Sequence, residues 1–181
     1  TTVEIGDRST IRECVTINRG TKAYGKTVVG KDCLIMAYVH IAHDCILGDH
    51  VILVNSVALA GHVEIGDYAI ISGLSAVHQF VKIGAHVMIG GGAMVRKDVP
   101  PFITAAGEPL AYAGVNSVGL KRRNFSEDEI NEIQTLYRTL YQSGMNVSQA
   151  VRKIEETYSK LPVADAILSF IEQSDRGLIR K

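Results

Sequence analysis

A six-residue repeat constrains this chain more than any other feature of its sequence. From Val29 to Val95 every sixth residue is Val, Ile or Leu, and the same phase extends back to Ile5. Four residues after each anchor from Val29 on stands a small or β-branched residue, and glycine directly follows several anchors, as at Gly48. A period of six fits neither an amphipathic helix nor a plainly alternating strand.

Each six-residue unit can form one short strand and one turn, with the anchor pointing inward and glycine permitting the backbone of the corner. One unit cannot bury its anchor alone, so the units must stack. This arrangement resembles the left-handed parallel β-helix of the hexapeptide-repeat proteins. The resemblance implies that three units form one triangular coil and that residues 18 apart lie above one another. The chain is therefore predicted to be mainly β.

The repeat also predicts how the chain is divided. A left-handed β-helix domain is expected over residues 1–101, with a polar loop leaving the coil at about 18–27; the alternative is one irregular unit there. Pro100 and Pro101 are expected to end the sheets, because proline supplies no ladder donor. Residues 102–124 are predicted to form an irregular connection. Residues 125–181 are predicted to form a small helical domain of three amphipathic helices, opened by the Ser126–Glu129 capping box.

Composition excludes several classes of protein. The 181 residues include 19 basic and 19 acidic ones, so no net field favours nucleic acid. No apolar run is long enough to predict a transmembrane helix, and the first residues are not expected to form a signal peptide. The chain begins in mid-pattern without Met, which favours an N-terminally truncated sequence. Cys33 and Cys45 fall on the small inward position and are predicted to be buried packing residues.

The 18-residue stacking rule gathers polar residues at one corner of the predicted prism. His43 lies 18 residues before Gly61, which is expected to leave an open slot beside the imidazole for a substrate. His50 and His86 belong to a column on another face and are predicted to be surface or packing residues. Seven residues are predicted to converge at the polar corner: His40, His43, Asp44, Gly61, His62, His78 and Gln79.

Two chemistries suit such a cluster. A neutral imidazole can act as a general base near pH 7. Three imidazoles can instead bind zinc, as in the trimeric hexapeptide-repeat carbonic anhydrases. The carboxylate directly after His43 and the slot at Gly61 favour acyl transfer, so we expect no metal and no cofactor.

Six longer motifs and the C-terminal residues stand out: His40-Ile41-Ala42-His43-Asp44-Cys45, Leu59-Ala60-Gly61-His62-Val63, Ala76-Val77-His78-Gln79-Phe80, Ile83-Gly84-Ala85-His86-Val87-Met88, Gly114-Val115-Asn116, Gly119-Leu120-Lys121-Arg122-Arg123 and the terminal Arg176-Gly177-Leu178-Ile179-Arg180. They resemble the motifs of the UDP-N-acetylglucosamine O-acyltransferase family. The resemblance implies a cytoplasmic homotrimer that moves an (R)-3-hydroxyacyl group from acyl carrier protein to the 3-hydroxyl of UDP-N-acetylglucosamine, the first step of lipid A biosynthesis.

The resemblance also implies residue roles. His43 would be the general base, Asp44 would orient or polarise it, and the Gly61 N–H would stabilise the oxyanion. His40 and His62 would hold the sugar. The nucleotide or its phosphates would be held by His78, Gln79, Asn116, Arg122 and Arg123. Met88 and Gly91 would line an acyl groove in which bulk limits chain length.

The residues alone leave alternatives open. The basic run at Arg122 and Arg123 is either a solvated hinge or a docking point for an anion. Gly91 provides either extra turn flexibility or room for a hydrocarbon chain. The competing functions are a related N-acyltransferase acting on UDP-3-acyl-glucosamine, an acetyl-CoA-dependent acetyltransferase, a zinc carbonic anhydrase-like protein and a non-catalytic β-helix scaffold.

Overall fold

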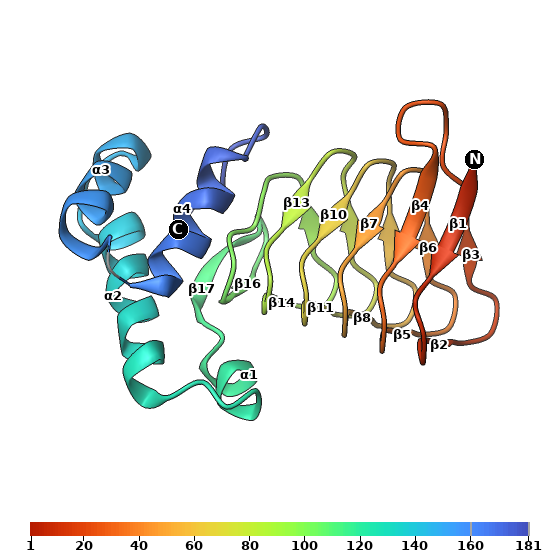
Figure 1. Cartoon of the computed structure of the whole chain (residues 1–181), viewed down its shortest axis with the longest axis horizontal. Helices are drawn as coiled ribbons and strands as arrows, with labels where there is room; N and C mark the ends of the chain where they lie inside the picture. The colour runs from red at the N-terminus through yellow and green to blue at the C-terminus, as the bar shows by residue number, and fades with distance from the viewer. Residues whose placement is uncertain (160, 181) are drawn as a thin grey trace.

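The computed structural model describes residues 1–159 and 161–180, which form a three-sided β-helix followed by helices (Figure 1). The predicted β-helix is therefore confirmed. Sheet A contains β1 (Thr2–Ile5), β4 (Lys26–Val29), β7 (Ile46–Leu47), β10 (Glu64–Ile65) and β13 (Lys82–Ile83). Sheet B contains β2 (Thr10–Ile11), β5 (Leu34–Ile35), β8 (Ile52–Leu53), β11 (Ile70–Ile71), β14 (Met88–Ile89), β16 (Ile103–Ala106) and β17 (Ala111–Val115). Sheet C contains β3 (Thr16–Ile17), β6 (His40–Ile41), β9 (Ala58–Leu59), β12 (Ala76–Val77) and β15 (Met94–Val95).

The register follows the repeat between β4 and β15 and departs from it at the first coil and at β16, whose Thr104 pairs with Met88 at a spacing of 16. Neighbouring strands of the regular coils are parallel and pair residues 18 apart, as Ile52 pairs with Ile70. The first coil pairs with the second at a spacing of 24, as Thr10 pairs with Leu34. The six additional residues belong to the loop of residues 18–25, which protrudes between β3 and β4 near the N-terminus (Figure 1). Because six is one whole unit, the loop leaves the phase of the anchors unchanged.

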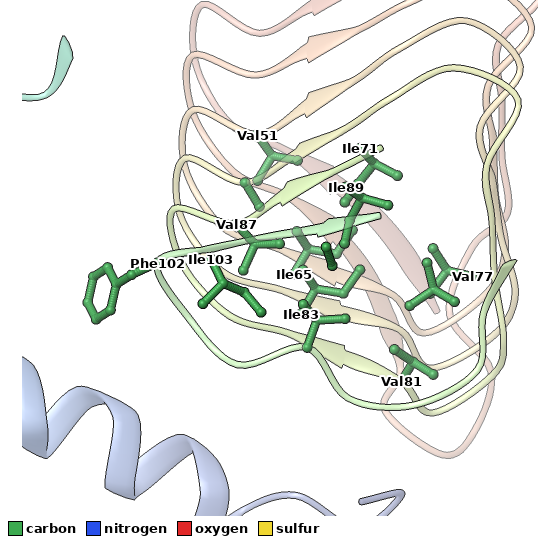
Figure 2. Close-up of a cluster of buried hydrophobic side chains, with 14 of the residues drawn as sticks. Val51, Ile65, Ile71, Val77, Val81, Ile83, Val87, Ile89, Phe102 and Ile103 are labelled. Carbon is green, nitrogen blue, oxygen red and sulfur yellow. The ribbon is translucent and has the colours of Figure 1, made fainter. Parts of the chain in front are cut away.

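The anchors form the core of the prism (Figure 2). In each two-residue strand from β5 to β15 the second residue is buried and the first faces outward, as Ile71 and Ile70 show. Each fully buried Ile or Leu contributes roughly 1.5–3 kcal/mol to stability. Cys33 and Cys45 are buried among these side chains with free thiols, as predicted.

The glycines that follow the anchors do not serve the corner conformation, as the sequence suggested. The left-handed φ values fall two residues later and mostly on other residue types, among them Asp44 (φ 59°) and His62 (φ 62°). The glycines instead allow the coils to approach. A Cβ on Gly66 would lie 2.6 Å from the backbone nitrogen of Ala85 in the next coil. Coils stacked at strand spacing, about 4.8 Å, leave no room for a side chain there.

The region after Pro101 differs from the prediction in two ways. The β-helix does not end there, because β16 continues sheet B by pairing parallel with β14, and β17 pairs antiparallel with β16. Residues 102–124 are therefore not an irregular connection, since they hold two strands and a short helix. The prolines lie between strands, where no ladder donor is required.

Four helices are present in the described residues, one more than predicted: α1 (Ser117–Arg122), α2 (Glu127–Gln142), α3 (Val147–Tyr158) and α4 (Pro162–Glu172). The Ser126–Glu129 capping box opens α2 as predicted. Buried Tyr137 of α2 donates a hydrogen bond to the carbonyl of Pro101, which joins the helices to the last coil. Residues 160 and 181 of the predicted helical domain lie outside the described residues. None of the described helices is both long and apolar enough to cross a membrane.

Candidate active site

The corner between sheets C and A carries a histidine paired with a carboxylate. The imidazole Nδ1 of His43 lies 2.9 Å from Oδ2 of Asp44. The His43 side chain is 42% exposed, whereas the Asp44 side chain is completely buried. Because the carboxylate can only accept, the hydrogen belongs to Nδ1 and the bare Nε2 is the basic atom of the ring.

Asp44 stays ionised although it is buried. Burial by itself raises the pKa of a carboxyl group, but hydrogen bonds from Thr21, His43 and Tyr24 outweigh this and hold the pKa of Asp44 well below its usual range. The Thr21 hydroxyl lies 2.6 Å from Oδ2, and the backbone nitrogens of Thr21 and Tyr24 lie 2.9 Å and 3.4 Å from Oδ1. The carboxylate is thus available to orient His43 at neutral pH.

The space above Gly61 is filled by the imidazole of His43, so the predicted open slot is wrong. A Cβ at Gly61 would lie 2.7 Å from Cε1 of His43 and 2.9 Å from Nε2. Glycine is needed there because the ring lies flat against the next coil. Among the described residues no acceptor is paired with the Gly61 N–H. This donor is therefore free to meet a developing negative charge near Nε2.

His62 packs beside this pair. Its ring stacks on Phe80 at 4.6 Å between centroids and meets the rings of His43 and Tyr24 edge-on at 5.2 Å and 5.1 Å. Its Nε2 lies 3.7 Å from Oδ2 of Asp44, and its buried Nδ1 lacks a partner within the described part of the chain. One ligand atom each from His43, Asp44 and His62 lie within 4.8 Å of one another, so this trio could also hold a metal ion.

The other histidines predicted for this corner make contacts elsewhere. His40 faces outward from β6 on sheet C, and its Nδ1 lies 2.7 Å from the hydroxyl of Thr16. His78 is exposed at the corner with Nδ1 3.2 Å from the carbonyl of Gln79. The structure thus joins His43, Asp44, Gly61 and His62 closely, whereas the side-chain contacts of His40 and His78 are with Thr16 and Gln79.

The predicted nucleotide-binding residues Asn116 and Arg123 lie at another corner, between sheets A and B. The Arg123 guanidinium donates to the carbonyl of Tyr68 at 3.0 Å and lies 5.1 Å from the centre of its ring. Asn116 caps α1 and donates to the carbonyl of His86 at 2.9 Å. Arg122 is exposed beside them. Within one chain these residues do not share a corner with His43.

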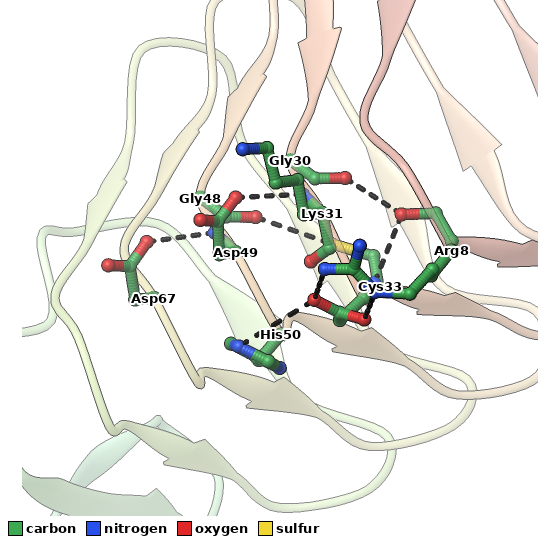
Figure 3. A network of polar contacts seen from close by, with 10 residues as sticks. Arg8, Gly30, Lys31, Cys33, Gly48, Asp49, His50 and Asp67 are labelled. Carbon is green, nitrogen blue, oxygen red and sulfur yellow. Dashed lines mark hydrogen bonds and ion pairs between the residues drawn. The ribbon is translucent and has the colours of Figure 1, made fainter.

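The same corner carries a continuous stack of rings and a ladder of carboxylates. His86 stacks between Tyr68 and Phe102. Burial, with a smaller effect of the Arg123 charge, lowers the pKa of His86 to about 4. Nearer the N-terminus, the Asp67 carboxylate accepts from the backbone of Asp49 (2.8 Å), and the Asp49 carboxylate accepts from that of Lys31 (2.7 Å) (Figure 3). These contacts make this corner a rigid structural edge.

The two residues predicted to line an acyl groove lie on or beside sheet B. Met88 is the outward residue of β14. Gly91 lies at the corner between sheets B and C, where a Cβ would meet only the carbonyl oxygen of Gly73 at 3.5 Å and Cβ of Ser72 at 3.9 Å. The backbone does not require glycine at this position, and the missing side chain leaves open surface.

Thr21 and Tyr24, which hold Asp44 from the loop of residues 18–25, were not predicted from the sequence. Their contacts could not be read from the stacking rule, because the loop lies outside the repeat. The sequence feature that could have indicated these contacts is the interruption of the six-residue repeat, which falls one coil before the corner that holds His43.

Six-residue units, a triangular prism and a histidine–carboxylate pair at one corner define a hexapeptide-repeat transferase. Residues 26–61 match the bacterial transferase hexapeptide family (six repeats), and residues 98–179 match domain 2 of UDP-N-acetylglucosamine O-acyltransferase. The acyl-[acyl-carrier-protein]–UDP-N-acetylglucosamine O-acyltransferase of Janthinobacterium sp. (strain Marseille) is 50% identical over 185 residues, which cover 99% of this chain and 71% of that protein. The chain belongs to the UDP-N-acetylglucosamine O-acyltransferase family.

Solved structures agree with this assignment. The UDP-N-acetylglucosamine acyltransferase of Bacteroides fragilis superposes with a TM-score of 0.96 at 49% identity, over 98% of this chain and 70% of that one. The Francisella novicida UDP-N-acetylglucosamine acyltransferase superposes with a TM-score of 0.96 at 43% identity, over 99% of this chain and 66% of that one. A perosamine N-acetyltransferase from Caulobacter crescentus gives only 0.57 at 29% identity, over 62% of this chain and 50% of that one. The likeness to the O-acyltransferases includes the helices, whereas the N-acetyltransferase matches a smaller part.

Proposed function

We propose that this chain transfers an (R)-3-hydroxyacyl group from acyl carrier protein to the 3-hydroxyl of UDP-N-acetylglucosamine, the reaction that opens lipid A biosynthesis. The names of the relatives support the substrates. The observation that carries the chemistry is the His43–Asp44 pair, which leaves Nε2 of an accessible imidazole bare beside the free N–H of Gly61.

The reaction follows from this geometry. Nε2 of His43 takes the proton of the sugar hydroxyl while its oxygen attacks the thioester carbon, so a C–O bond forms. The carbonyl oxygen becomes an oxyanion that accepts from the Gly61 N–H. The carbonyl then re-forms, the C–S bond breaks, and the leaving thiolate takes the proton back from Nε2. Asp44 holds the ring through Nδ1 and stabilises the imidazolium formed in between.

A homotrimer would bring the two separate corners together. Sheet B has an apolar outer face, and sheet C has small outward residues at Ala58 and Ala76. If the corner between these sheets lies at a threefold axis, sheet C of one chain faces sheet B of the next. The corner of His43 then lies beside the neighbouring corner of Asn116 and Arg123. The outward apolar residues of sheet B are Leu34, Ile52, Ile70 and Met88.

The remaining predicted residues would take the following roles in this arrangement. His62 packs against His43, and we propose that it holds the sugar together with His40, while His78 and Gln79 would reach toward the nucleotide. Asn116, Arg122 and Arg123 of the neighbouring chain supply the amide and the cations for the diphosphate. Met88 and Gly91 lie where the acyl chain can follow the boundary between two chains. We expect the enzyme to act in the cytoplasm, as the resemblance to the family implies.

The decisive test is an acyl-transfer assay with product identification. Purified protein is incubated with UDP-N-acetylglucosamine and 3-hydroxyacyl carrier proteins of several chain lengths, and products are identified by mass spectrometry. An ester at the 3-hydroxyl supports the proposal. Acylation only of UDP-3-acyl-glucosamine at its amino group would instead favour the related N-acyltransferase, and acetyl transfer from acetyl-CoA would favour an acetyltransferase.

A zinc enzyme is the second candidate, because His43, Asp44 and His62 offer three ligand atoms close together. Against it, Oδ2 of Asp44 already accepts from the Thr21 hydroxyl and from His43. Treatment with a chelator, followed by metal analysis and the acyl-transfer assay, separates the two. Activity that survives metal removal supports the acyltransferase without metal; loss of stoichiometric zinc together with activity supports the zinc enzyme.

A further inference from the structure

We propose that Thr21 is a positioning residue for the reaction, and that the loop of residues 18–25 departs from the repeat in order to fix the Asp44 carboxylate. This inference rests on the proposed function, since it assigns Thr21 a part in keeping His43 in its basic form. Thr21 acts through Asp44 and does not itself touch the reacting atoms.

The contacts of the Asp44 carboxylate carry the argument. Oδ2 receives the Thr21 hydroxyl at 2.6 Å and Nδ1 of His43 at 2.9 Å. Oδ1 receives the Thr21 backbone nitrogen at 2.9 Å and the Tyr24 backbone nitrogen at 3.4 Å. Three of these four donors come from the loop. The hydroxyl of Thr21 in turn accepts from the backbone of Ala23 at 3.2 Å, which directs its hydrogen toward Asp44.

The fold shows why these donors must come from a loop. Asp44 stands at the corner position that is occupied by His62 and Phe80 in the next two coils. A buried carboxylate needs several donors, and a regular coil offers few polar groups to this position. At this corner the first coil is replaced by the loop, whose extra six residues fold over Asp44. The departure from the repeat therefore places donors where the carboxylate needs them.

As a consequence, the orientation and the tautomer of the His43 imidazole are fixed. With one lone pair of Oδ2 engaged by Thr21 and the other facing Nδ1, the carboxylate cannot rotate away from the imidazole. The hydrogen of the neutral ring is held on Nδ1, and Nε2 remains bare for the sugar hydroxyl. When a hydrogen bond holding an orienting carboxylate is lost, the wrong tautomer gains population and turnover falls.

The experiment compares Thr21→Val, which removes the hydroxyl but keeps the size and the backbone N–H, with Thr21→Ser, which restores the hydroxyl. We expect Thr21→Val to lower kcat about 10- to 100-fold, the range of one hydrogen bond to a charged group. KM for UDP-N-acetylglucosamine should change less than about twofold, because Thr21 is proposed to act through Asp44 and not on the sugar. Thr21→Ser should recover most of the activity. Thr2→Val, the same chemical change on exposed β1, is the matched control and should keep full kcat.

A second readout does not depend on turnover. The ¹⁵N chemical shifts of the His43 ring report which nitrogen carries the hydrogen, and a ¹³C-detected titration reports the pKa of the Asp44 carboxyl. In Thr21→Val the Nδ1–H form should lose population and the pKa of Asp44 should rise. Thr21→Ser and Thr2→Val should resemble the unmodified chain.

The outcomes separate this inference from the proposed function. A kcat in Thr21→Val within twofold of the unmodified chain, or a loss that serine does not restore, would overturn the role of Thr21. So would unchanged ring shifts in Thr21→Val. If the unmodified protein transfers no acyl group, the proposed function fails, while the ring shifts still decide whether Thr21 positions His43.

Discussion

At the scale of single residues, the reactivity of His43 depends on three neighbours that act on different sides of its ring. Asp44 holds Nδ1, Gly61 gives the ring a flat surface, and His62 packs edge-on against it. Asp44 follows His43 in the chain, whereas Gly61 and His62 lie in the next coil. Only the combination of the three leaves Nε2 both without a hydrogen and accessible. The chemistry therefore belongs to the corner and not to the histidine alone.

The general-base role makes a direct prediction for His43→Ala. Turnover should fall about 10²- to 10⁴-fold, the usual contribution of general-base catalysis. The melting temperature should be nearly unchanged, because the side chain is 42% exposed and adds little to the core. Steady-state kinetics and thermal unfolding measure the two quantities, and a variant that keeps more than about a tenth of full activity would rule out the role.

Gly91 allows a test of the acyl groove. Since a Cβ at this position meets no atom closer than 3.5 Å, Gly91→Met adds bulk without straining the backbone. Each buried methylene contributes about 0.8 kcal/mol, so a groove shortened by a few carbons should disfavour the longest donors. Competition among 3-hydroxyacyl carrier proteins of different lengths should show a shift to shorter chains. An unchanged preference in a folded variant would remove Gly91 from the groove.

At the scale of structural elements, the glycine column and the ring stack keep successive coils in register. The column of glycines after the anchors of sheet A removes side chains where coils approach most closely. The stack from His50 to Phe102 continues the corner between sheets A and B toward the helices. Both features extend over several coils, so we expect a substitution in one coil to affect the packing of the coils next to it.

The glycine column predicts a contrast between two alanine substitutions. Gly66→Ala places a Cβ 2.6 Å from the backbone nitrogen of Ala85, which cannot move without shifting a coil. It should destabilise the protein by about 1–3 kcal/mol, as overpacking usually does. Gly91→Ala, whose Cβ would meet no atom of its own chain closer than 3.5 Å, should change stability by less than about 0.5 kcal/mol. Urea unfolding at one protein concentration compares the two, and equal effects would contradict the close-approach explanation.

The ring stack predicts a pH dependence that originates at His86. Its folded pKa of about 4 lies below the ordinary value of 6.5, so protonation favours the unfolded chain. The stability that neutral His86 contributes is complete above about pH 6.5 and is lost as the pH falls toward 4. His86→Phe preserves the stack but cannot be protonated. Between pH 7 and pH 4.5 its free energy of unfolding should therefore fall by about 1–2 kcal/mol less than that of the unmodified chain. Parallel curves of melting temperature against pH would show that His86 does not titrate in this range.

At the scale of the whole molecule, His43 and Arg123, which are proposed to work in one active site, lie apart within a single chain. His43 lies at the corner between sheets C and A, and Arg123 lies at the corner between sheets A and B. The width of sheet A therefore separates them. A threefold assembly restores their proximity without altering either corner. It also covers the apolar outer row of sheet B, which a solitary chain would expose.

The proposed trimer is tested by Ile70→Glu, which places a charge in the middle of the outer face of sheet B. The variant should sediment as smaller species and lose activity, because burying an unpaired charge at an interface is strongly unfavourable. Ile46→Glu makes the same change on sheet A, which the proposed trimer leaves free, and should remain a trimer. Equal behaviour of the two variants in sedimentation equilibrium would contradict the assignment of the faces.

A second experiment asks whether the site is shared between chains. Chains carrying His43→Ala and chains carrying Arg123→Ala are each expected to be inactive alone. Unfolded and refolded together, they should form mixed trimers in which some corners pair an intact His43 with an intact Arg123 of the neighbour. Recovery of up to about a quarter of full activity is expected from random mixing of the two chains. No recovery in mixed trimers would place both residues in a site of one chain.

The repeat by itself determined the β-helix, its inward anchors and the stacking of His43 over Gly61, because a period of six is a local property that every coil repeats. The adjacency of His43 and Asp44 is likewise written in the chain. Only the tertiary structure decided that Thr21 reaches Asp44, that the His43 ring fills the space above Gly61, and that Arg123 stands at another corner. These contacts depend on the path of segments outside the repeat and on side-chain directions within it, and a period carries no information about either. The continuation of sheet B beyond Pro101 has the same origin, since β16 is held there by its pairing with β14 and not by a repeat of its own.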